Sequence, residues 1–571
     1  MRSEISVVLA GAAGQGIDTV AGILSAITKG SGFNVFVTKE FMSRIRGGTN
    51  SLQLRISSHR VGAYTKHTDI AVPLNESALA HLEQYGRLSN DAVIIGEKEF
   101  LGGKATTKYR GIYEVPFTEI AKEVGGKIYS NTVAAGVIAA FLGVDESVTQ
   151  EYLKQRFASK GNEIVKNNLE AYDKGFKIGM GIAEKMTMDL KIETDAGVRE
   201  ELLLSGTDAI AMGAIAGGCN FIASYPMSPS TGVLTFLSQQ ATAFGIVVDQ
   251  AEDEIAAINK GIGAWYAGAR AIITTSGGGF ALMNEGVSLS GMLETPIVIH
   301  LAQRPGPATG LPTRTEQGDL NFALHSGHGE FPRIIYTPGT LDEAFRLAKK
   351  AFNNAAKYQV PVFLITDQFF LDSSYNTPKP STDEPIEKHI VKTNSSYKRY
   401  KLTDDGISPR GVPGFGSGLV VADSDEHDEE GHITEDLNLR IVMVDKRLKS
   451  KLAVLRSATE PPSLEGADGN KHLVVCWGSN YFAVREALSQ LESNPFTMMH
   501  FAQVYPLSIR VKEILQKADR VFAVETNAVG QFANLLQRDL GISIPMENRL
   551  LSYNGLPIPV ETVVEFLGSK R

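Results

Sequence analysis

The stretch that decides the fold class, residues 245–280, reads GIVVDQAEDEIAAINKGIGAWYAGARAIITTSGGGF. An apolar run is followed by a segment with the spacing of an amphipathic helix, by a second apolar run and by a glycine cluster. Parallel strands need a long crossover connection, usually a helix, so this order predicts a parallel α/β sheet. The same alternation extends over residues 195–375, with further strands expected at 220–226, 296–302 and 361–367.

The segments on either side show the same kind of order. Residues 5–30, ISVVLAGAAGQGIDTVAGILSAITKG, predict a strand, a glycine turn and an amphipathic helix, and NVFVTKE at 34–40 predicts a second strand. A parallel sheet is therefore expected in a first unit over 1–190. Proline, glycine and acidic residues predict a loop-rich connection over 376–465, and 466–571 predict a last, small α/β domain.

Composition excludes several classes of function. The 571 residues include 56 Lys plus Arg and 64 Asp plus Glu, and this net charge of −8 argues against a nucleic-acid or anionic-membrane binder. No apolar run approaches the roughly 18 residues of a membrane span, so a cytoplasmic protein is expected. The two cysteines, Cys219 and Cys476, cannot supply the usual four thiolates of an iron–sulfur cluster.

Two groups of histidines are candidate metal ligands. Neither group has a recognisable ligand spacing, so no metal site is predicted in this chain. The groups are His325, His328 and Glu330, and His427 with His432.

Two loops of the first unit carry alternative interpretations. GAAGQG, residues 11–16, could bind a dinucleotide phosphate at a helix start, with Glu40 near the place of a ribose-binding acid. Ala13 stands where such a motif needs its second glycine, which favours a plain tight turn. Arg44 and Arg46, beside Gly47, form either an ordinary basic loop or an anion-binding loop.

The second predicted unit, residues 195–375, contains three candidate loops. Tyr225, Pro226 and Ser228 belong to YPMSPST, a proline-stiffened segment that is either a helix cap or a ligand loop. Glu254 follows a predicted strand, where helix dipoles favour acids but where α/β sheets also bind ligands. Arg304, with Arg314 beyond it, borders a Pro/Gly loop and suits bidentate binding of a carboxylate.

In their order along the chain, these segments resemble the α subunit of the 2-oxoacid:ferredoxin oxidoreductases, in the form with a γ domain fused to its N-terminus. The resemblance implies several doubly wound α/β domains: a γ domain, a thiamine-pyrimidine-binding domain and a C-terminal domain like that of transketolase. The segment DGISPRGVPG is similar to subfamily members that act on 2-oxoglutarate. The motifs that carry the resemblance are GAAGQGIDTVAG (11–22), SRIRGGTNS (43–51), YPMSPST (225–231), SGGGFALMNEG (276–286), QRPGPATGLPTRTEQGDL (303–320), DGISPRGVPG (405–414) and ETNAVGQFANLLQRDLG (525–541).

The resemblance implies thiamine diphosphate chemistry shared between two subunits. Glu254 would bind the pyrimidine ring nitrogen, Arg304 the substrate's 1-carboxylate, and Tyr225, Pro226 and Ser228 would contact cofactor or substrate. Departures from the family pattern are Met227 and Ser228, Gly278 in place of proline and Ala13 in place of glycine. The γ-domain loop with Arg44, Arg46 and Gly47 would lie near coenzyme A.

A β subunit would hold the diphosphate, its Mg²⁺ and a [4Fe–4S] cluster, in an (αβ)₂ heterotetramer that reduces ferredoxin. This chain has no Gly-Asp-Gly triplet, with which a thiamine enzyme's Mg²⁺ site usually begins. The implied reaction converts 2-oxoglutarate and coenzyme A reversibly to succinyl-CoA and CO₂. Pyruvate or another 2-oxoacid as substrate, a lipoamide-linked dehydrogenase and a non-catalytic assembly subunit are the alternatives.

Overall fold

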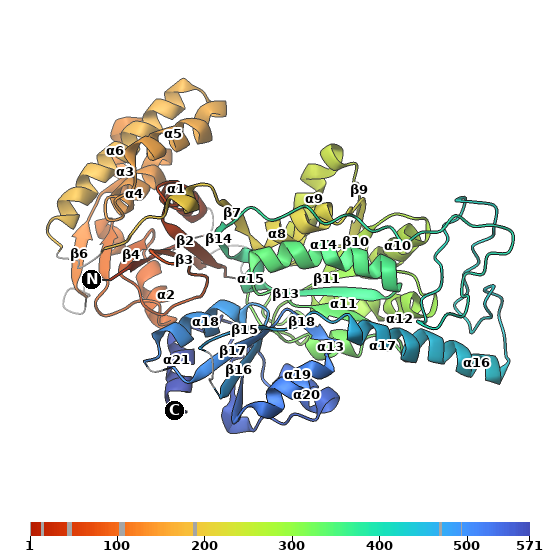
Figure 1. Cartoon of the computed structure of the whole chain (residues 1–571). Coiled ribbons are helices and arrows are strands. Elements are labelled where there is room, and N and C mark those ends of the chain that lie inside the picture. Colours follow the sequence, from red (N-terminus) through yellow and green to blue (C-terminus); the bar gives the residue numbers. More distant parts are fainter. Residues whose placement is uncertain are drawn as a thin grey trace. The chain divides into compact units, whose positions relative to one another are not determined.

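The computed structural model describes residues 2–12, 16–42, 48–101, 109–186, 191–467, 471–492 and 494–570. The chain forms two compact units (Figure 1). The first comprises Met1–Ser205, Asp372–Lys379 and Pro559–Glu561, and the second Gly206–Leu371, Pro380–Ile558 and Thr562–Arg571. Among the described residues, no helix is both long and apolar enough to cross a membrane.

The first unit is built on an eight-stranded sheet with the order β6-β5-β4-β1-β3-β2-β14-β7. β1 is parallel to β4 but antiparallel to β3, which in turn is antiparallel to β2. The expected parallel sheet is therefore wrong for this unit, because the connection from β2 to β3 is too short for a crossover. The strands are β1 (Glu4–Ala12), β2 (Asn34–Glu40), β3 (Thr49–Ser57), β4 (Ile70–Pro73), β5 (Val93–Gly96), β6 (Gly111–Glu114), β7 (Leu202–Ser205) and β14 (Ser374–Thr377).

Helices of the first unit lie mainly on one face of this sheet (Figure 1). The closest helix pair is α4 with α6, where glycines allow backbone contact: a Cβ on Gly175 would lie 2.1 Å from the carbonyl oxygen of Val133. The helices are α1 (Ile17–Gly30), α2 (Ala78–Gln84), η1 (Lys98–Phe100), α3 (Phe117–Val124), η2 (Lys127–Tyr129), α4 (Ser130–Ala139), α5 (Glu146–Phe157), η3 (Ala158–Lys160), α6 (Asn162–Ala183) and α7 (Ala196–Arg199).

The second unit contains a seven-stranded sheet with the order β18-β12-β13-β11-β10-β8-β9, parallel except for β18. The chain runs outward from β8 to β9 and then returns past β8 to β10. This reversal is a topological switch point, the place where open α/β sheets bind ligands. The strands are β8 (Phe221–Ser224), β9 (Val247–Gln250), β10 (Ala271–Thr275), β11 (Ile297–Gln303), β12 (Ile334–Tyr336), β13 (Pro361–Asp367) and β18 (Gln503–Tyr505).

A smaller sheet, β15-β17-β16-β19-β20, forms the C-terminal part of this unit. Its strands are β15 (Ser463–Glu465), β16 (His472–Trp477), β17 (Phe496–Phe501), β19 (Arg520–Glu525) and β20 (Arg549–Leu551). The helices of the unit are α8 (Gly206–Ala216), α9 (Thr231–Phe244), α10 (Glu254–Tyr266), α11 (Gly277–Phe280), η4 (Ala281–Met283), α12 (Asn284–Met292), α13 (Leu320–Leu324), α14 (Leu341–Tyr358), α15 (Gln368–Asp372), α16 (Leu437–Val444), η5 (Asp445–Ser450), α17 (Lys451–Ser457), α18 (Asn480–Gln490), α19 (Ile509–Lys517), α20 (Gln531–Leu540), η6 (Met546–Asn548) and α21 (Val560–Gly568), the last of which begins in the first unit. The predicted α/β class is confirmed.

Residues 378–436 carry no helix or strand, and helical structure resumes at 437. The η5 segment between α16 and α17 is a turn of π-helix. Lys446 within it and Lys451 just after it both reach Glu294, with Nζ to carboxylate distances of 2.6 and 2.5 Å. All three side chains are buried, so this ion cluster fixes the helix against the body of the unit.

Candidate functional site

Four loops follow β8, β9, β10 and β11 at one edge of the seven-stranded sheet, because parallel neighbours end on the same side. These loops carry the site residues that the sequence predicts for the second unit. The Arg304 Nη1 donates to the carbonyl oxygen of Ser228 over 2.8 Å, which joins the β11 and β8 loops directly. The carboxylate of Glu254 lies against Gly279, which joins the β9 and β10 loops.

Glu254 is the first residue of α10, and its placement comes from a capped helix start. Asp253 is the N-cap residue, and its carboxylate accepts from the backbone N–H of Ala256 over 2.8 Å. The Glu254 side chain is 3% exposed, and its Oε1 has no hydrogen-bond partner among the described residues. Burial raises the pKa of the Glu254 carboxyl. A buried oxygen without a partner is costly, so the geometry suits a ligand that supplies a hydrogen bond here.

The glycine loop after β10 leaves the space that this carboxylate occupies. A Cβ on Gly279 would lie 2.3 Å from Glu254 Oε1, and a Cβ on Gly277 would lie 2.5 Å from Asp319 Oδ2. The fully buried Ser276 also has a hydroxyl without a described hydrogen-bond partner. Polar atoms without partners thus converge on a single loop.

Arg304 lies where β11 ends, half-buried beside the β8 loop. Its Nε is buried without a hydrogen-bond partner among the described residues, while its Nη1 is held by Ser228. Burial lowers the pKa of the guanidinium, and the nearby carboxylate of Asp319 acts in the opposite direction. One edge of the guanidinium is therefore fixed by the protein, and the Nε side can donate to a ligand carboxylate.

Asp319 was missed by the sequence analysis, although it lies within the QGDL segment quoted there. Its backbone N–H donates to Gln303 Oε1 over 2.9 Å, and its buried Oδ2 has no hydrogen-bond partner among the described residues. Burial, followed by the charge of Glu316, raises the pKa of Asp319 to about 7, while Arg304 opposes the rise. The only sign of Asp319 in the sequence is its place directly before a short apolar segment. An acid at that place is also common as an ordinary helix cap.

A chain of buried polar side chains crosses the sheet beneath these loops. The Thr274 hydroxyl lies 2.8 Å from His300 Nδ1, and His300 Nε2 lies 2.9 Å from the Thr366 hydroxyl. Ser224, at the end of β8, donates to the carbonyl oxygen of Thr274. Burial lowers the pKa of His300 to about 3, so this imidazole is neutral and ties β10, β11 and β13 together just before their loops begin.

The remaining predicted residues of the β8 loop are more open. Tyr225 is 40% exposed and the Ser228 side chain is exposed, while Pro226 is half-buried. Exposed apolar side chains surround the loop edge: besides Tyr225, Ile255 directly follows Glu254, Leu282 lies beyond the glycine loop and Leu311 lies in the loop after β11.

In the first unit, the dinucleotide interpretation is not supported. Glu40 is buried in an ion pair with Arg87, Oε2 to Nε 2.9 Å, and accepts from the Ser51 hydroxyl, so it is committed within the protein. β1 and β2 are separated by β3, unlike the adjacent parallel strands of a dinucleotide fold. Ala13, Arg44, Arg46 and Gly47 lie outside the described residues.

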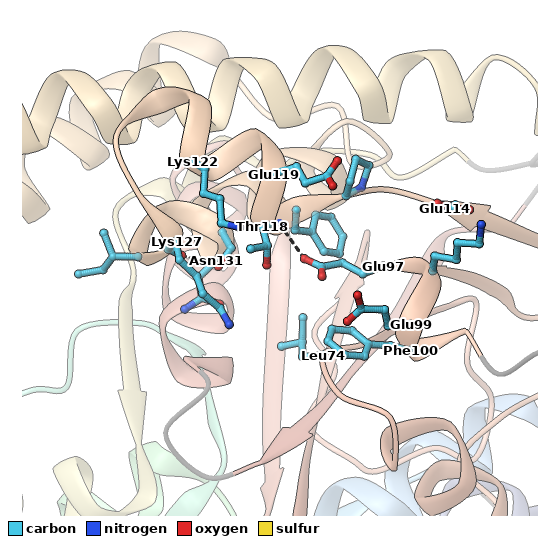
Figure 2. Close-up of a pocket in the computed structure, with 15 residues that line it drawn as sticks. Leu74, Glu97, Glu99, Phe100, Glu114, Thr118, Glu119, Lys122, Lys127 and Asn131 are labelled. Atoms are coloured by element: carbon cyan, nitrogen blue, oxygen red, sulfur yellow. Dashed lines mark hydrogen bonds between the residues drawn. The ribbon is translucent and has the colours of Figure 1, made fainter.

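A cavity of about 710 Å³ lies at the carboxyl ends of β4, β5 and β6 in this unit (Figure 2). Its lining mixes charges: Glu97, which accepts from the backbone N–H of Thr118 over 2.7 Å, faces a wall with Lys122, Lys127 and Asn131. The Asn131 amide lies against Gly16, where a Cβ would be 1.9 Å from its Nδ2. Gly16, directly before α1, therefore lies against the wall of this cavity.

The candidate metal-ligand histidines His427 and His325 contact side chains that are not metal ligands. The ring of His427 lies 3.8 Å from that of Tyr400, and His325 Nε2 lies 2.8 Å from Arg538 Nη1. No group of three or more His, Cys, Asp or Glu in the described part of the chain could hold a metal ion. Cys219 and Cys476 are both free and buried.

Two family models match the chain. Residues 212–446 match "Pyruvate flavodoxin/ferredoxin oxidoreductase, thiamine diP-bdg", and residues 6–178 match "Pyruvate ferredoxin/flavodoxin oxidoreductase". The first match contains all four loops of the site. The second unit therefore includes a thiamine diphosphate-binding domain, and the first includes the domain expected from the γ-like resemblance.

Three known proteins are similar over most of their length. The 2-oxoacid:ferredoxin oxidoreductase subunit alpha of Sulfolobus sp is 32% identical, covering 99% of this chain and 96% of that protein. The 2-oxoglutarate synthase subunit KorA of Archaeoglobus fulgidus is 30% identical, covering 64% of this chain and 98% of that protein. A solved structure of 2-oxoglutarate:ferredoxin oxidoreductase from Magnetococcus marinus, with 2-oxoglutarate, coenzyme A and succinyl-CoA bound, covers 100% of both chains at a TM-score of 0.92 and 28% identity.

The similarity extends over both units, and the site lies within the matched thiamine-binding domain. On these findings the chain belongs to the alpha subunits of the 2-oxoacid:ferredoxin oxidoreductases and carries their γ-like domain at its N-terminus.

Proposed function

We propose that this chain supplies the pyrimidine half of the thiamine diphosphate site in an enzyme that oxidatively decarboxylates 2-oxoglutarate to succinyl-CoA. The observation that carries the proposal is the buried Oε1 of Glu254, which has no partner within the described residues and lies at the switch point of the sheet. A pyrimidine ring nitrogen offers the hydrogen bond that this oxygen lacks. Bound thiamine diphosphate supplies a carbon nucleophile and an electron sink.

Glu254 is suited to share a proton with that ring nitrogen. Its pKa is already raised by burial, so the protonated and ionised forms are closer in free energy than for an exposed carboxyl. Gly279 leaves the carboxylate its space, and the β8 loop with Tyr225, Pro226 and Ser228 forms the neighbouring wall of the proposed cofactor site.

Arg304 binds the 1-carboxylate of the 2-oxoacid in this proposal. Its Nη1 is anchored on the Ser228 carbonyl, which orients the planar guanidinium, and its buried Nε remains to donate. A charge-assisted hydrogen bond to a carboxylate would compensate the guanidinium for part of the interaction with water that burial has removed. The Ser228 hydroxyl is assigned a supporting contact to substrate or cofactor.

The other half of the cofactor site is assigned to a β subunit. That subunit would hold the diphosphate with Mg²⁺ and a [4Fe–4S] cluster, and it would pass single electrons to ferredoxin. The exposed apolar side chains Ile255, Leu282 and Leu311 around the site support such a cover, because a permanent interface buries apolar surface. Pairing of two αβ units would give an (αβ)₂ assembly.

Coenzyme A is proposed as the acyl acceptor, with Arg44, Arg46 and Gly47 near its entrance. Support comes from the coenzyme A and succinyl-CoA bound in the Magnetococcus marinus structure, whose chain aligns over its whole length. The boundaries 1–190 for the γ domain, 195–375 for the pyrimidine-binding domain, 376–465 for the connection and 466–571 for the C-terminal domain belong to the same proposal.

The choice of 2-oxoglutarate rests on the similarity to two proteins named for that substrate. The test is to co-express the chain with a candidate β chain and measure viologen reduction with coenzyme A on a panel of 2-oxoacids. We expect 2-oxoglutarate to give the highest kcat/KM. A preference for pyruvate would overturn only the proposed substrate. Inactivity with every 2-oxoacid, despite an assembled complex, would contradict the proposed oxidoreductase activity.

A further inference from the structure

A second cleft of the second unit, of about 560 Å³, lies where α13, the π-helical turn η5, α17 and α20 meet. Its volume is typical of small-molecule sites. The basic side chains of its wall are His325, Arg333, Lys449, Arg456 and Arg538, and the one acid in the lining is Glu330. No part of the proposed thiamine site contributes to this cleft.

The guanidinium groups converge rather than merely share a surface. The phenol of Tyr505, which also lines the cleft, lies within electrostatic range of the Asp539 carboxylate and of the guanidinium groups of Arg333, Arg456 and Arg538. Burial, followed by the charges of Arg538 and Arg333, lowers the pKa of His325. His325 and Arg333 lie in the connection between α13 and β12, Arg456 lies in α17 and Arg538 in α20, so the tertiary fold, not a local basic run, creates the positive potential.

Two of these cations keep donors for a ligand. Arg456 is exposed, and its guanidinium forms no hydrogen bond or ion pair with the residues that the structure describes. Arg538 Nη1 lies 2.8 Å from His325 Nε2, and its Nε donates to Asp539 over 2.6 Å, which orients the planar guanidinium. Arg333 is nearly buried, and its Nη1 bonds to the carbonyl oxygen and hydroxyl of Ser326 over 2.9 and 2.8 Å.

The rest of the wall is apolar. Leu324, Leu448 and Leu452 line it, and the ring of Phe331 lies 4.5 Å below the Arg333 guanidinium. An inorganic anion would bind the basic side chains but leave this apolar surface exposed to solvent. A ligand with both a polyanionic end and an aromatic or apolar body would use the whole cleft.

We propose that this cleft is a binding site for an organic diphosphate, such as a nucleoside diphosphate, separate from the thiamine site. The phosphates lie against Arg456 and Arg538, with Arg333 behind them, and the base lies against the leucines. Arginine suits this role because its planar fork binds phosphate oxygens in pairs. Ligand binding here joins α17 to α13 and α20, and α13 begins directly after Asp319 of the thiamine site.

The test uses the assembled complex, saturated with thiamine diphosphate and Mg²⁺, and isothermal titration with ADP at 150 mM salt. Arg456→Ala and Arg538→Ala should each weaken ADP binding about tenfold or more, the usual effect of losing a charge-assisted hydrogen bond. Arg510→Ala removes another exposed arginine, from α19 and outside the cleft, and should leave ADP affinity unchanged. Melting temperatures of the variants check that each remains folded.

Further probes separate the parts of the ligand. Inorganic pyrophosphate should bind more weakly than ADP but show the same dependence on Arg456, and adenosine alone should bind weakest. ADP affinity that is equal in the wild type and both cleft variants would overturn the proposal, because the site would then lie elsewhere. Binding that disappears at 150 mM salt, or that Arg510→Ala weakens equally, would overturn it as general surface electrostatics.

Discussion

The carboxylate of Glu254 occupies the space that a side chain on Gly279 would need, since a Cβ there would lie 2.3 Å from Oε1. The two residues belong to different loops, one after β9 and one after β10. The lack of a Cβ on Gly279 therefore contributes to the position of the Glu254 carboxylate as much as any hydrogen bond does. This relationship makes the glycine loop part of the proposed cofactor site.

Gly279→Ala should displace the Glu254 carboxylate and lower turnover by at least tenfold, because that shift moves the proton donor out of alignment. Gly278→Ala is the matched control, since a Cβ on Gly278 has its nearest neighbour, the carbonyl oxygen of Ala308, at 3.6 Å. Activity of the co-expressed complex and thiamine diphosphate affinity are the measurements. Equal losses in both variants would contradict the proposed role of Gly279.

Glu254→Gln keeps the size of the side chain but cannot share a proton in the same way. We expect turnover, and exchange of the cofactor's reactive proton measured by NMR, to fall by orders of magnitude while the melting temperature changes little. Glu252→Gln is the control, because Glu252 is an exposed acid of the same loop. Near-normal turnover of Glu254→Gln would remove this residue from the mechanism.

Arg304→Lys replaces a planar fork, anchored on the Ser228 carbonyl, by a point charge. We expect KM for the 2-oxoacid to rise and kcat/KM to fall by about tenfold or more, with little change in KM for coenzyme A. Steady-state kinetics of the complex with each substrate varied in turn provide the measurement. Parallel changes in both KM values would instead indicate a general loss of structure.

Asp319 should make the stability of the chain depend on pH. Burial raises the pKa of Asp319 to about 7, from 3.8 for an exposed aspartate, so folding favours its protonated form. The native state then binds more protons than the unfolded state between these two values, and the carboxylate increasingly destabilises the fold as pH rises through that range. Asp319→Asn should therefore gain thermal stability relative to the wild type, slightly near pH 4 and most above pH 7.

Thermal unfolding of the full chain at several pH values from 4 to 8, with wild type and Asp319→Asn in parallel, measures this difference. The full effect should reach a few kcal/mol at most, since each pKa unit corresponds to about 1.4 kcal/mol. A difference between the two proteins that stays constant across the range would show that Asp319 does not titrate as described.

The chain on its own should be colourless and inactive. Cys219 and Cys476 are both buried and free, so this chain offers no set of four thiolates. Anaerobic expression with iron should give no visible absorbance near 400 nm and no viologen reduction that depends on coenzyme A. Both the absorbance and the viologen reduction should be seen when a cysteine-rich subunit with a Gly-Asp-Gly motif is added. A brown, active single chain would contradict the proposal that the cluster and the diphosphate site belong to a second subunit.

The sequence was sufficient to predict the second unit's strands and the loops that carry Glu254 and Arg304, because alternating apolar and helical spacing places loops at strand ends. It did not predict the antiparallel β1–β3 and β2–β3 pairs, since pairing across a sheet depends on chain topology rather than on local pattern. Asp319 was missed because its importance comes from burial beside Gly277, and neither residue signals the other in sequence.

The π-helical turn at Asp445–Ser450 sets the register of the helix that contains it. In a regular α-helix, side chains five positions apart point about 140° away from each other, so Lys446 and Lys451 could not both reach one carboxylate. The wider π-helical turn brings both ammonium groups onto Glu294 across this spacing of five. Deleting a single residue there would restore ordinary winding and place the two lysines four positions apart, about 40° from each other, so both could still face Glu294. The contact with Glu294 therefore depends on both lysines lying on one face of the helix, which a spacing of five achieves in a π-helical turn and a spacing of four in an α-helical turn.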